Sequence, residues 1–200
     1  MRLALSDIEE LYFIAPIINV PSILKHGLLS HNMTRQLKIR HVSVASQDVQ
    51  ARRSNKTIPG GRKLHDYANI YLNARNPMLY VLLNQQKELC VLRIDKRVLQ
   101  LRNAIVSDRN AARDWAKFEP APDGLEMIDK EEVFAVSWNH ADHFEKDRLK
   151  GVMCAEVLVP DKVEPRYIIG AYVSSQEAYD TLKDLCPDLD VRINRTLFFQ

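Results

Sequence analysis

One carboxylate in this sequence has no obvious way to be solvated. Glu156 lies in the middle of the apolar run Val152–Pro160, flanked by Ala155 and Val157. If this run is a buried strand, the carboxylate must be paired, at a strand edge or in a cleft, because burying it unpaired costs several kcal/mol. The alternative is a strand glutamate that faces solvent, and the pattern alone leaves both interpretations open.

The stretch from Asp48 to Leu83 gathers most of the other residues that could do chemistry. It opens with an expected short basic helix, Asp48–Lys56, which carries Arg52 and Arg53. Adjacent helix positions point about 100° apart, so only one of the two arginines can face a given site. One side chain can reach inward while the other joins the basic surface, although the pattern by itself favours two exposed arginines.

A glycine turn and a polar triplet follow this helix. Pro59-Gly60-Gly61 is a turn signal, since glycine adopts positive φ without strain, and His65-Asp66-Tyr67 comes shortly after it. The triplet offers a charge-assisted His–Asp pair beside an aromatic ring. Alternatively, His65 and Asp66 cap and stabilise a turn. No Ser or Cys stands close to the triplet in the sequence, so a hydrolase triad has little support.

Familiar metal and nucleotide motifs are missing from the sequence. The six histidines show no HExxH spacing and the cysteines no CxxC spacing, and neither a Walker loop nor a GxGxxG run occurs. We therefore expect no metal site.

The distribution of charge is more informative than its total of +2. Of the 28 basic and 26 acidic residues, eight basic and one acidic fall between Arg35 and Lys63, which leaves 20 basic and 25 acidic elsewhere. A basic segment on an otherwise acidic protein suggests a phosphate-bearing partner. The alternative is a solvated basic loop.

Length and composition favour one domain over residues 1–200, with 46% hydrophobic residues to form its core. No apolar run reaches the ~18 residues of a membrane span. The acidic residues Asp7, Glu9 and Glu10 interrupt the N-terminal stretch, which argues against a secretory signal. Three isolated cysteines favour reduced thiols and a cytoplasmic location.

Short strands and helices alternate, which indicates an α+β domain. We expect helices at Pro21–His26 with Asn19 as a cap, from Asn76-Pro77 onward, from Asp108 towards Trp115, and at Asp142–Gly151 and Ser175–Leu185. We expect strands at Leu11–Ile14, Ile70–Leu72, Leu89–Ile94, Ala104–Ser107, Val152–Pro160, Tyr167–Val173, Val191–Ile193 and Leu197–Phe199.

Several of these segments together resemble the DarT family, the ADP-ribosyltransferase toxins that modify bases in DNA. The resemblance covers most of the chain in order and with similar spacing, and its LHDY…PMLY block is the most specific part. The matching segments are Leu11–Ala15, Ile23–Asn32, Gln50-Ala51-Arg52-Arg53, Gly60–Tyr80, Ala155–Val159 and Phe198-Phe199.

The resemblance implies a fold, a cofactor and a reaction. The fold is the ADP-ribosyltransferase fold, a split β-sheet core with helices around an NAD cleft. NAD is the implied donor and single-stranded DNA the implied acceptor. The biological role would be a toxin of a toxin–antitoxin or phage-defence system, held in check by a macrodomain antitoxin that removes the modification.

The same resemblance assigns roles to individual residues. Glu156 matches the family's catalytic glutamate and Arg53 its catalytic arginine. Tyr71 matches an aromatic residue on the nicotinamide side, and Asn32 falls where the family has an asparagine near the cofactor. The basic segment would track the nucleic-acid phosphates, and two aromatic residues could stack on bases, so the expected nucleic-acid contacts are Arg52, Lys56, Arg62, Lys63, Tyr67 and Trp138.

The chain departs from the family pattern at three positions, which mark it as a diverged member. Phe13 replaces a first-strand histidine that would contact the adenosine ribose, and Ala15 stands at a nearby hydroxyl position. Asn110 replaces another histidine. Losing one buried hydrogen bond costs ~0.5–1.5 kcal/mol, so Phe13 is expected to weaken NAD binding without abolishing it.

Three functions remain in competition. The chain is a DNA-base transferase, a transferase of the same fold that acts on RNA or protein, or a catalytically silent nucleic-acid-binding module. Glu156 and Arg53 argue against the silent module, whereas Phe13 argues for it. NAD consumption and the identity of the labelled acceptor distinguish the three.

Overall fold

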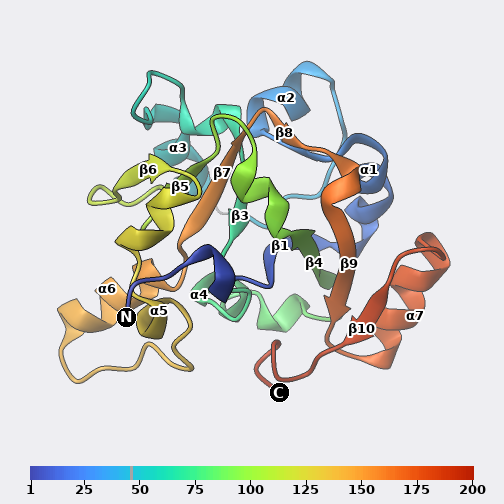
Figure 1. Cartoon of the computed structure of the whole chain (residues 1–200). Helices are drawn as coiled ribbons and strands as arrows, with labels where there is room; N and C mark the ends of the chain where they lie inside the picture. Colours follow the sequence, from blue (N-terminus) through green and yellow to red (C-terminus); the bar gives the residue numbers. More distant parts are fainter. Residues whose placement is uncertain (46) are drawn as a thin grey trace.

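An eight-stranded sheet forms the centre of the protein (Figure 1). The structure is a computed structural model that describes residues 1–45 and 47–200. The strand order is β10-β9-β4-β1-β3-β7-β5-β6, and all neighbours are antiparallel except β9 and β10. The strands are β1 (Glu10–Pro16), β3 (Tyr67–Tyr71), β4 (Leu89–Asp95), β5 (Ile105–Ser107), β6 (Phe118–Pro120), β7 (Glu156–Pro160), β9 (Ile168–Val173) and β10 (Val191–Ile193). A separate small sheet pairs β2 (Leu28–Leu29) with β8 (Lys162–Val163).

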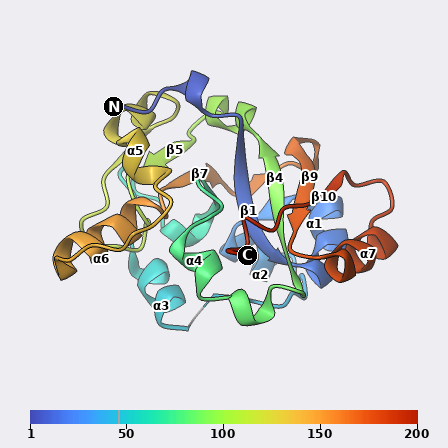
Figure 2. The same cartoon turned by 90° about the horizontal axis from the view of Figure 1, so that it is seen from below.

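Short helices surround this sheet. They are α1 (Val20–His26), α2 (His31–Gln36), α3 (Gln47–Asn55), α4 (Pro77–Tyr80), α5 (Lys130–Val133), α6 (His143–Val152) and α7 (Gln176–Leu185). Helices α1 and α7 lie at the β9–β10 end of the sheet, and α5 and α6 lie towards the β5–β7 end (Figures 1 and 2). Among the described residues, no helix has the length and apolar character needed to cross a membrane.

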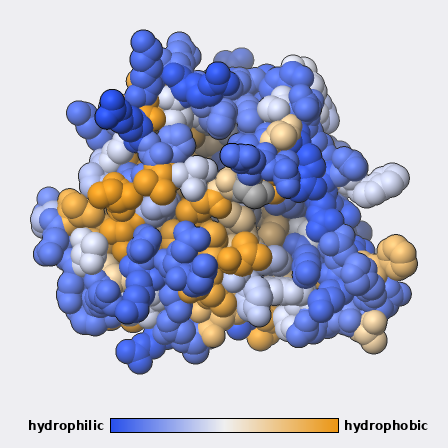
Figure 3. All heavy atoms as spheres, turned by 180° about the vertical axis from the view of Figure 1, so that it is seen from behind, coloured by the Kyte–Doolittle hydropathy of each residue, from blue (hydrophilic) through white to orange (hydrophobic). Residues whose placement is uncertain are grey.

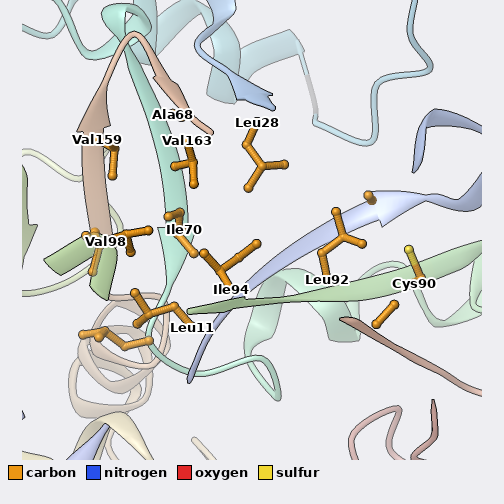
Figure 4. Close-up of a cluster of buried hydrophobic side chains, with 14 of the residues drawn as sticks. Leu11, Leu28, Ala68, Ile70, Cys90, Leu92, Ile94, Val98, Val159 and Val163 are labelled. Carbon is orange, nitrogen blue, oxygen red and sulfur yellow. The ribbon is translucent and has the colours of Figure 1, made fainter. Parts of the chain in front are cut away.

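The sheet is split between β1 and β3. These two strands pair only at Tyr12 and Tyr71, whereas β1 pairs with β4 from Glu10 to Pro16. The β1–β4 pair and the β3–β7 pair therefore diverge from a single point of contact, and they cross at a wide angle in Figure 4. The expected α+β fold with a split sheet is confirmed, while the single domain over residues 1–200 stays a prediction.

The alternation of side chains along β3 separates the core from the opposite face. Ala68 and Ile70 point into the main hydrophobic cluster, where they meet Leu92, Ile94 and other buried aliphatic residues (Figure 4). Tyr67, Asn69 and Tyr71 point the other way, as a strand of period two requires. The strand thus has one face that packs the core and one that is available for a site.

Most of the expected elements are present, and four expectations were wrong. The strand expected at Val152–Pro160 begins only at Glu156, because Val152 ends α6 and residues 153–154 form a turn. Leu197–Phe199 forms a turn rather than a strand, because Phe198 folds back into a second buried cluster. Residues 108–115 form turns and not a helix. Asn19 does not cap α1 with its side chain, which instead exchanges two hydrogen bonds with the backbone of Val42. Asn76 caps α4 as expected, accepting from the N–H of Leu79.

Candidate active site

Four polar side chains lie in register across the middle of the sheet. Tyr12 of β1 is paired with Tyr71 of β3, Tyr71 with Glu156 of β7, and Glu156 with Ser107 of β5. Directly paired residues point to the same face of a sheet, so Tyr71 and Glu156 are neighbours. Glu156 is fully buried, although it begins a strand whose next residues, Val157 onward, are apolar.

Arg53 of α3 is the partner of this buried carboxylate. Its Nη1 donates to both carboxylate oxygens of Glu156 and its Nη2 donates to Oε2, each at 3.2 Å. The backbone N–H of Ala111 donates to Oε1, also at 3.2 Å. Glu156 is therefore paired rather than solvent-facing, and the contact joins residues 103 positions apart in the chain.

The two adjacent arginines differ as helix geometry demands. Arg53 is 7% exposed, whereas Arg52 lies on the exposed side of α3. The expectation of two exposed arginines, which rested on the charge pattern alone, was wrong for Arg53. The charge pattern of the helix does not take account of the buried carboxylate on β7, which attracts one arginine of the pair.

A histidine contact ties α3 to the start of β3. His65 Nε2 lies 3.0 Å from Oε1 of Gln50, which precedes Arg53 by one helical turn. The His65 ring also stacks on His31 of α2, with centroids 4.1 Å apart. Burial, reinforced by His31 and Arg53, lowers the pKa of His65 to about 4, so the imidazole is neutral near pH 7.

Asp66 does not pair with His65. Its carboxylate accepts from Asn32 Nδ2 at 2.6 Å and from the backbone N–H of Lys63 at 3.1 Å. Asp66 therefore caps the short 3-10 turn Leu64–Asp66, which favours the turn-stabilising interpretation of the triplet.

Tyr71 keeps its proton beside Glu156. Burial raises the pKa of its phenol well above the usual value, and the nearby Glu156 carboxylate raises it further. Tyr71 is therefore a neutral hydroxyl group on the pocket wall, able to donate a hydrogen bond.

A pocket of about 520 Å³ occupies the split between β1 and β3. Phe13, Ile14 and Pro16 line it from β1, and Tyr67, Asn69 and Tyr71 line it from β3. The other walls come from α1, α2, the 39–45 segment, α3 and the loop at Asn110. Apolar side chains also gather broadly on the face seen in Figure 3, which is hollowed near its centre. A largely apolar pocket of this size with a few convergent polar groups is typical of a small-molecule or cofactor site.

The structure places some predicted cofactor residues on this pocket and others away from it. Phe13, Tyr71 and Arg53 line the wall, and Tyr67 does as well. Ala15 is fully buried in the main core, and Asn32 is exposed and bound to Asp66. Glu156 does not form part of the wall, because Arg53 lies over it.

The predicted nucleic-acid residues fall into two groups. Lys56 donates to the backbone oxygen of Arg113, and Arg62 pairs with Asp161 and lies 5.5 Å from the Tyr67 ring. Arg52 and Lys63 are exposed, and their side chains have no ion-pair partner among the described residues. Trp138 packs edge-on against Tyr80, with ring centroids 5.2 Å apart. Their role in binding nucleic acid stays a prediction.

His31, Gln50 and Asn69 line the pocket but were not predicted as site residues. Asn110, which the sequence marked only as a departure from the family pattern, also lines the pocket. Gln50 could have been found from its spacing of three before Arg53, which puts both on one helix face. Asn69 could have been found from its alternation with Tyr67 and Tyr71, whereas His31 carries no such signal.

Comparison with known proteins identifies the family. The family model described as "ssDNA thymidine ADP-ribosyltransferase, DarT" matches residues 12–199. The chain belongs to the DarT family. The resemblance inferred from the motifs is therefore confirmed, and DarT is a family of ADP-ribosyltransferases.

Two curated DarT relatives differ in their length. The chain is 32% identical to a DNA ADP-ribosyl transferase-DNA ADP-ribosyl glycohydrolase fusion protein of Thermosipho africanus, covering 96% of this chain and 50% of that protein. It is 26% identical to a DNA ADP-ribosyl transferase of Thermus aquaticus, covering 95% and 89%. The chain thus spans about half the length of the Thermosipho fusion.

Solved DarT structures share the fold. Thermosipho africanus DarTG in complex with ADP-ribose matches with a TM-score of 0.82 at 31% identity, over 96% of this chain and 51% of that one. Thermus sp. 2.9 DarT in complex with ADP-ribosylated ssDNA matches with a TM-score of 0.81 at 25% identity, over 98% and 99%. The same Thermus protein in complex with NAD+ matches with a TM-score of 0.75 at 24% identity, over 96% and 98%.

Proposed function

We propose that this chain transfers ADP-ribose from NAD to a thymidine base in single-stranded DNA. The observation that carries the proposal is the buried Arg53–Glu156 pair, which lies at the edge of the pocket in the split sheet. Family membership supplies the reaction class. The acceptor follows from the family description and from the ADP-ribosylated ssDNA held by Thermus sp. 2.9 DarT.

The residues around the pocket fit NAD as the co-substrate. The apolar side chains of Phe13, Ile14 and Ile23 suit the adenine ring, and the neutral hydroxyl of Tyr71 suits the nicotinamide half. Phe13 offers packing where a histidine would offer a hydrogen bond. Among the described residues, no group of three or more His, Cys, Asp or Glu is placed to hold a metal ion.

The transfer breaks one bond at the ribose C1′ and forms another. Nicotinamide leaves with the electron pair of its bond to C1′, and a ring nitrogen of the acceptor base supplies the new pair. Glu156 stabilises the positive charge that develops at the ribose, as carboxylates do in glycoside hydrolysis. It also accepts the proton that the attacking nitrogen gives up.

Arg53 has to loosen its hold before Glu156 can do this. Both oxygens of the carboxylate are occupied, by Arg53 and by the N–H of Ala111. A turn of the Arg53 side chain towards the pocket frees one carboxylate oxygen for a ribose hydroxyl. The released guanidinium can then bind a phosphate or the acceptor base.

The acceptor base must be unstacked to reach this pair. A single strand avoids the few kcal/mol needed to extrude a base from a duplex. Arg52 and Lys63, which are exposed, can contact the strand's phosphates, and Tyr67 or Trp138 can stack on its bases.

The biological setting proposed is that of a toxin in a toxin–antitoxin or phage-defence system. Three free, buried cysteines favour a reducing compartment such as the cytoplasm. A macrodomain partner that removes the modification is supported by the Thermosipho relative, in which a transferase and a glycohydrolase are fused.

Incubation with labelled NAD and separate pools of single-stranded DNA, RNA and protein tests the proposal. We expect label on DNA containing thymidine and none on the other pools, with Glu156→Gln as the inactive control. Label on RNA or protein would assign a different acceptor to the same fold. Nucleic-acid binding without NAD consumption would make the chain a silent binding module.

A further inference from the structure

Asn110 lines the pocket, and a hydrogen bond to its Oδ1 holds its side-chain amide in one orientation. Its side-chain Oδ1 accepts from the backbone N–H of Ala112 at 2.9 Å, which fixes which end of the amide faces the loop. Its backbone N–H donates to Gly151 and its carbonyl accepts from Arg113, each at 3.0 Å. The amide Nδ2 has no partner among the described residues, and it is not a sealed buried atom.

This donor lies close to the reacting groups. Asn110 lines the pocket, and the next residue, Ala111, donates its N–H to the Glu156 carboxylate. Asn110 is on the loop between β5 and β6, on the far side of β7 from the β1 wall. That loop is largely polar and carries the exposed Trp115, so it forms an outer rim rather than the deep apolar wall.

Thymine has the complementary chemistry. Its only ring nitrogen that does not carry the sugar is N3, and this atom lies between the carbonyl oxygens O2 and O4. Both oxygens are acceptors, whereas cytosine carries an N4 amino donor in place of O4. Cytosine keeps O2, so only a donor placed at position 4 distinguishes the two bases. Such a donor can bind thymine O4, whereas it would face the amino group of cytosine, which is also a donor.

We propose that Asn110 Nδ2 selects thymine over cytosine by donating a hydrogen bond to O4, the carbonyl oxygen that cytosine lacks. The inference rests on the proposed function and adds a specificity-determining residue to it. Asn110 binds the acceptor base in this arrangement and not the NAD half of the site. A site that hydrogen-bonds a substrate group loses discrimination when its donor is removed, which gives the inference a distinct readout.

Asn110→Asp is the sharpest variant. It keeps the Oδ1 that accepts from Ala112 N–H and replaces the donor nitrogen with an acceptor oxygen of similar shape. Asn110→Ser is the second variant, because its hydroxyl can still accept from Ala112 N–H while no charge is added. Asn84→Ala is the matched control, since Asn84 is exposed and outside the pocket.

The experiment measures transfer to oligonucleotides that carry one target base: thymidine, 2-thiothymidine, 4-thiothymidine or deoxycytidine. Sulfur accepts a hydrogen bond less well than oxygen, so wild type should lose about 3- to 10-fold on 4-thiothymidine. Asn110→Ser should show nearly equal rates on that base and on thymidine. The thio substitution also changes the acidity of N3. This change affects wild type and variant alike, so it cancels when their ratios of the rate on the thio base to the rate on thymidine are compared. Asn110→Asp should use deoxycytidine better relative to thymidine than wild type does.

The outcomes separate this inference from the proposed function. An unchanged thymidine-to-thio ratio in both variants overturns the role of Asn110. A raised KM for NAD with unchanged base preference also overturns it and assigns Asn110 to the cofactor. If wild type transfers to none of the oligonucleotides, the proposed acceptor fails instead. The melting temperature of each variant, compared with that of Asn84→Ala, shows whether the loop is intact, and the base ratio remains informative at reduced total activity.

Discussion

The two sides of the Arg53–Glu156 contact are built in opposite ways. Glu156 begins β7, a strand in the middle of the sheet whose residues Glu156 to Val159 are all buried. Arg53 comes from α3, a polar nine-residue helix in which it is the only buried residue. The carboxylate is thus held by the core, whereas the arginine is held by the carboxylate itself and by the Gln50–His65 contact.

This difference suggests that the carboxylate is rigid and the guanidinium is adjustable. A polar helix that is held by few contacts can move at little cost, and such elements commonly change position when ligands bind. Strand β7 beneath this helix cannot move in the same way, because it is buried within the sheet. Variants on the two sides should therefore fail in different ways, and four predictions follow this contrast from the largest expected effect to the smallest.

Glu156→Gln should cause the largest loss of transfer. The amide keeps the shape of the carboxylate but removes the charge that stabilises the ribose, which we expect to lower kcat by about 10²- to 10³-fold. The fold should persist, because Oε1 of the glutamine can still accept from Ala111 N–H and the Arg53 side chain can turn towards the pocket that it lines. Single-turnover transfer and circular dichroism measure both effects. Wild-type turnover in this variant would remove Glu156 from the mechanism.

Arg53→Ala should reduce both activity and stability, and Arg52→Ala should affect neither by much. Removing Arg53 leaves a buried, unpaired carboxylate, and breaking such a pair typically costs ~3–5 kcal/mol. Arg52 is exposed and has no ion-pair partner among the described residues. Urea unfolding and transfer assays on both variants test the contrast. Equal, mild effects would mean that the arginine pair is surface charge.

His65 should make the α2–α3 side sensitive to acid. Its pKa is about 4 in the folded protein and near 6.5 in the unfolded chain, so the unfolded chain takes up the proton first as the pH falls. The stability should therefore decline between about pH 6.5 and pH 4. His65→Gln should flatten this decline, and His143→Gln, at an exposed position, should not. Urea midpoints measured from pH 7 to pH 4.5 test this prediction. If the midpoint of His65→Gln fell with pH as steeply as that of wild type, the acid sensitivity would belong to other groups.

The same contrast explains which features the sequence could predict. Burial of Glu156 was only partly predictable, because the apolar residues within four positions on either side indicated a buried strand but left a solvent-facing glutamate open. The strand itself begins at Glu156. The choice of Arg53 over Arg52 was not predictable from charge, because it depends on the phase of α3 against a strand 103 residues away. The strand expected at Leu197–Phe199 was wrong for a related reason. The apolar neighbours of Phe198 suggest a strand, but a turn that depends on tertiary packing buries its ring.

The role proposed for Asn110 shows most clearly what could not be predicted from the sequence. A turn of polar residues between two strands looks like any surface loop in sequence. The loop is placed beside the candidate active site by one backbone N–H, that of Ala111, which donates to the Glu156 carboxylate 45 positions away. The resemblance to DarT identified the residue as a departure from a pattern, and the structure adds its place on the pocket and the hydrogen bond that orients its amide.

The smallest expected effect concerns the basic segment, where the structure divides residues that the sequence grouped together. Arg52 and Lys63 are exposed, whereas Lys56 is bound to the Arg113 carbonyl and Arg62 to Asp161. Neutralising Arg52 and Lys63 together should weaken binding of single-stranded DNA and lower the salt slope by about 1.4, at ~0.7 for each phosphate that is no longer neutralised. Neutralising Lys56 and Arg62 should leave the slope nearly unchanged and lower the melting temperature slightly, because exposed pairs such as Arg62–Asp161 contribute only ~0–1 kcal/mol. Fluorescence anisotropy at several salt concentrations distinguishes the two double variants. If the second variant changed the slope and the first did not, the strand would have to displace the Lys56 and Arg62 contacts when it binds, and the adjustable side of the site would extend from α3 into the turn that follows it.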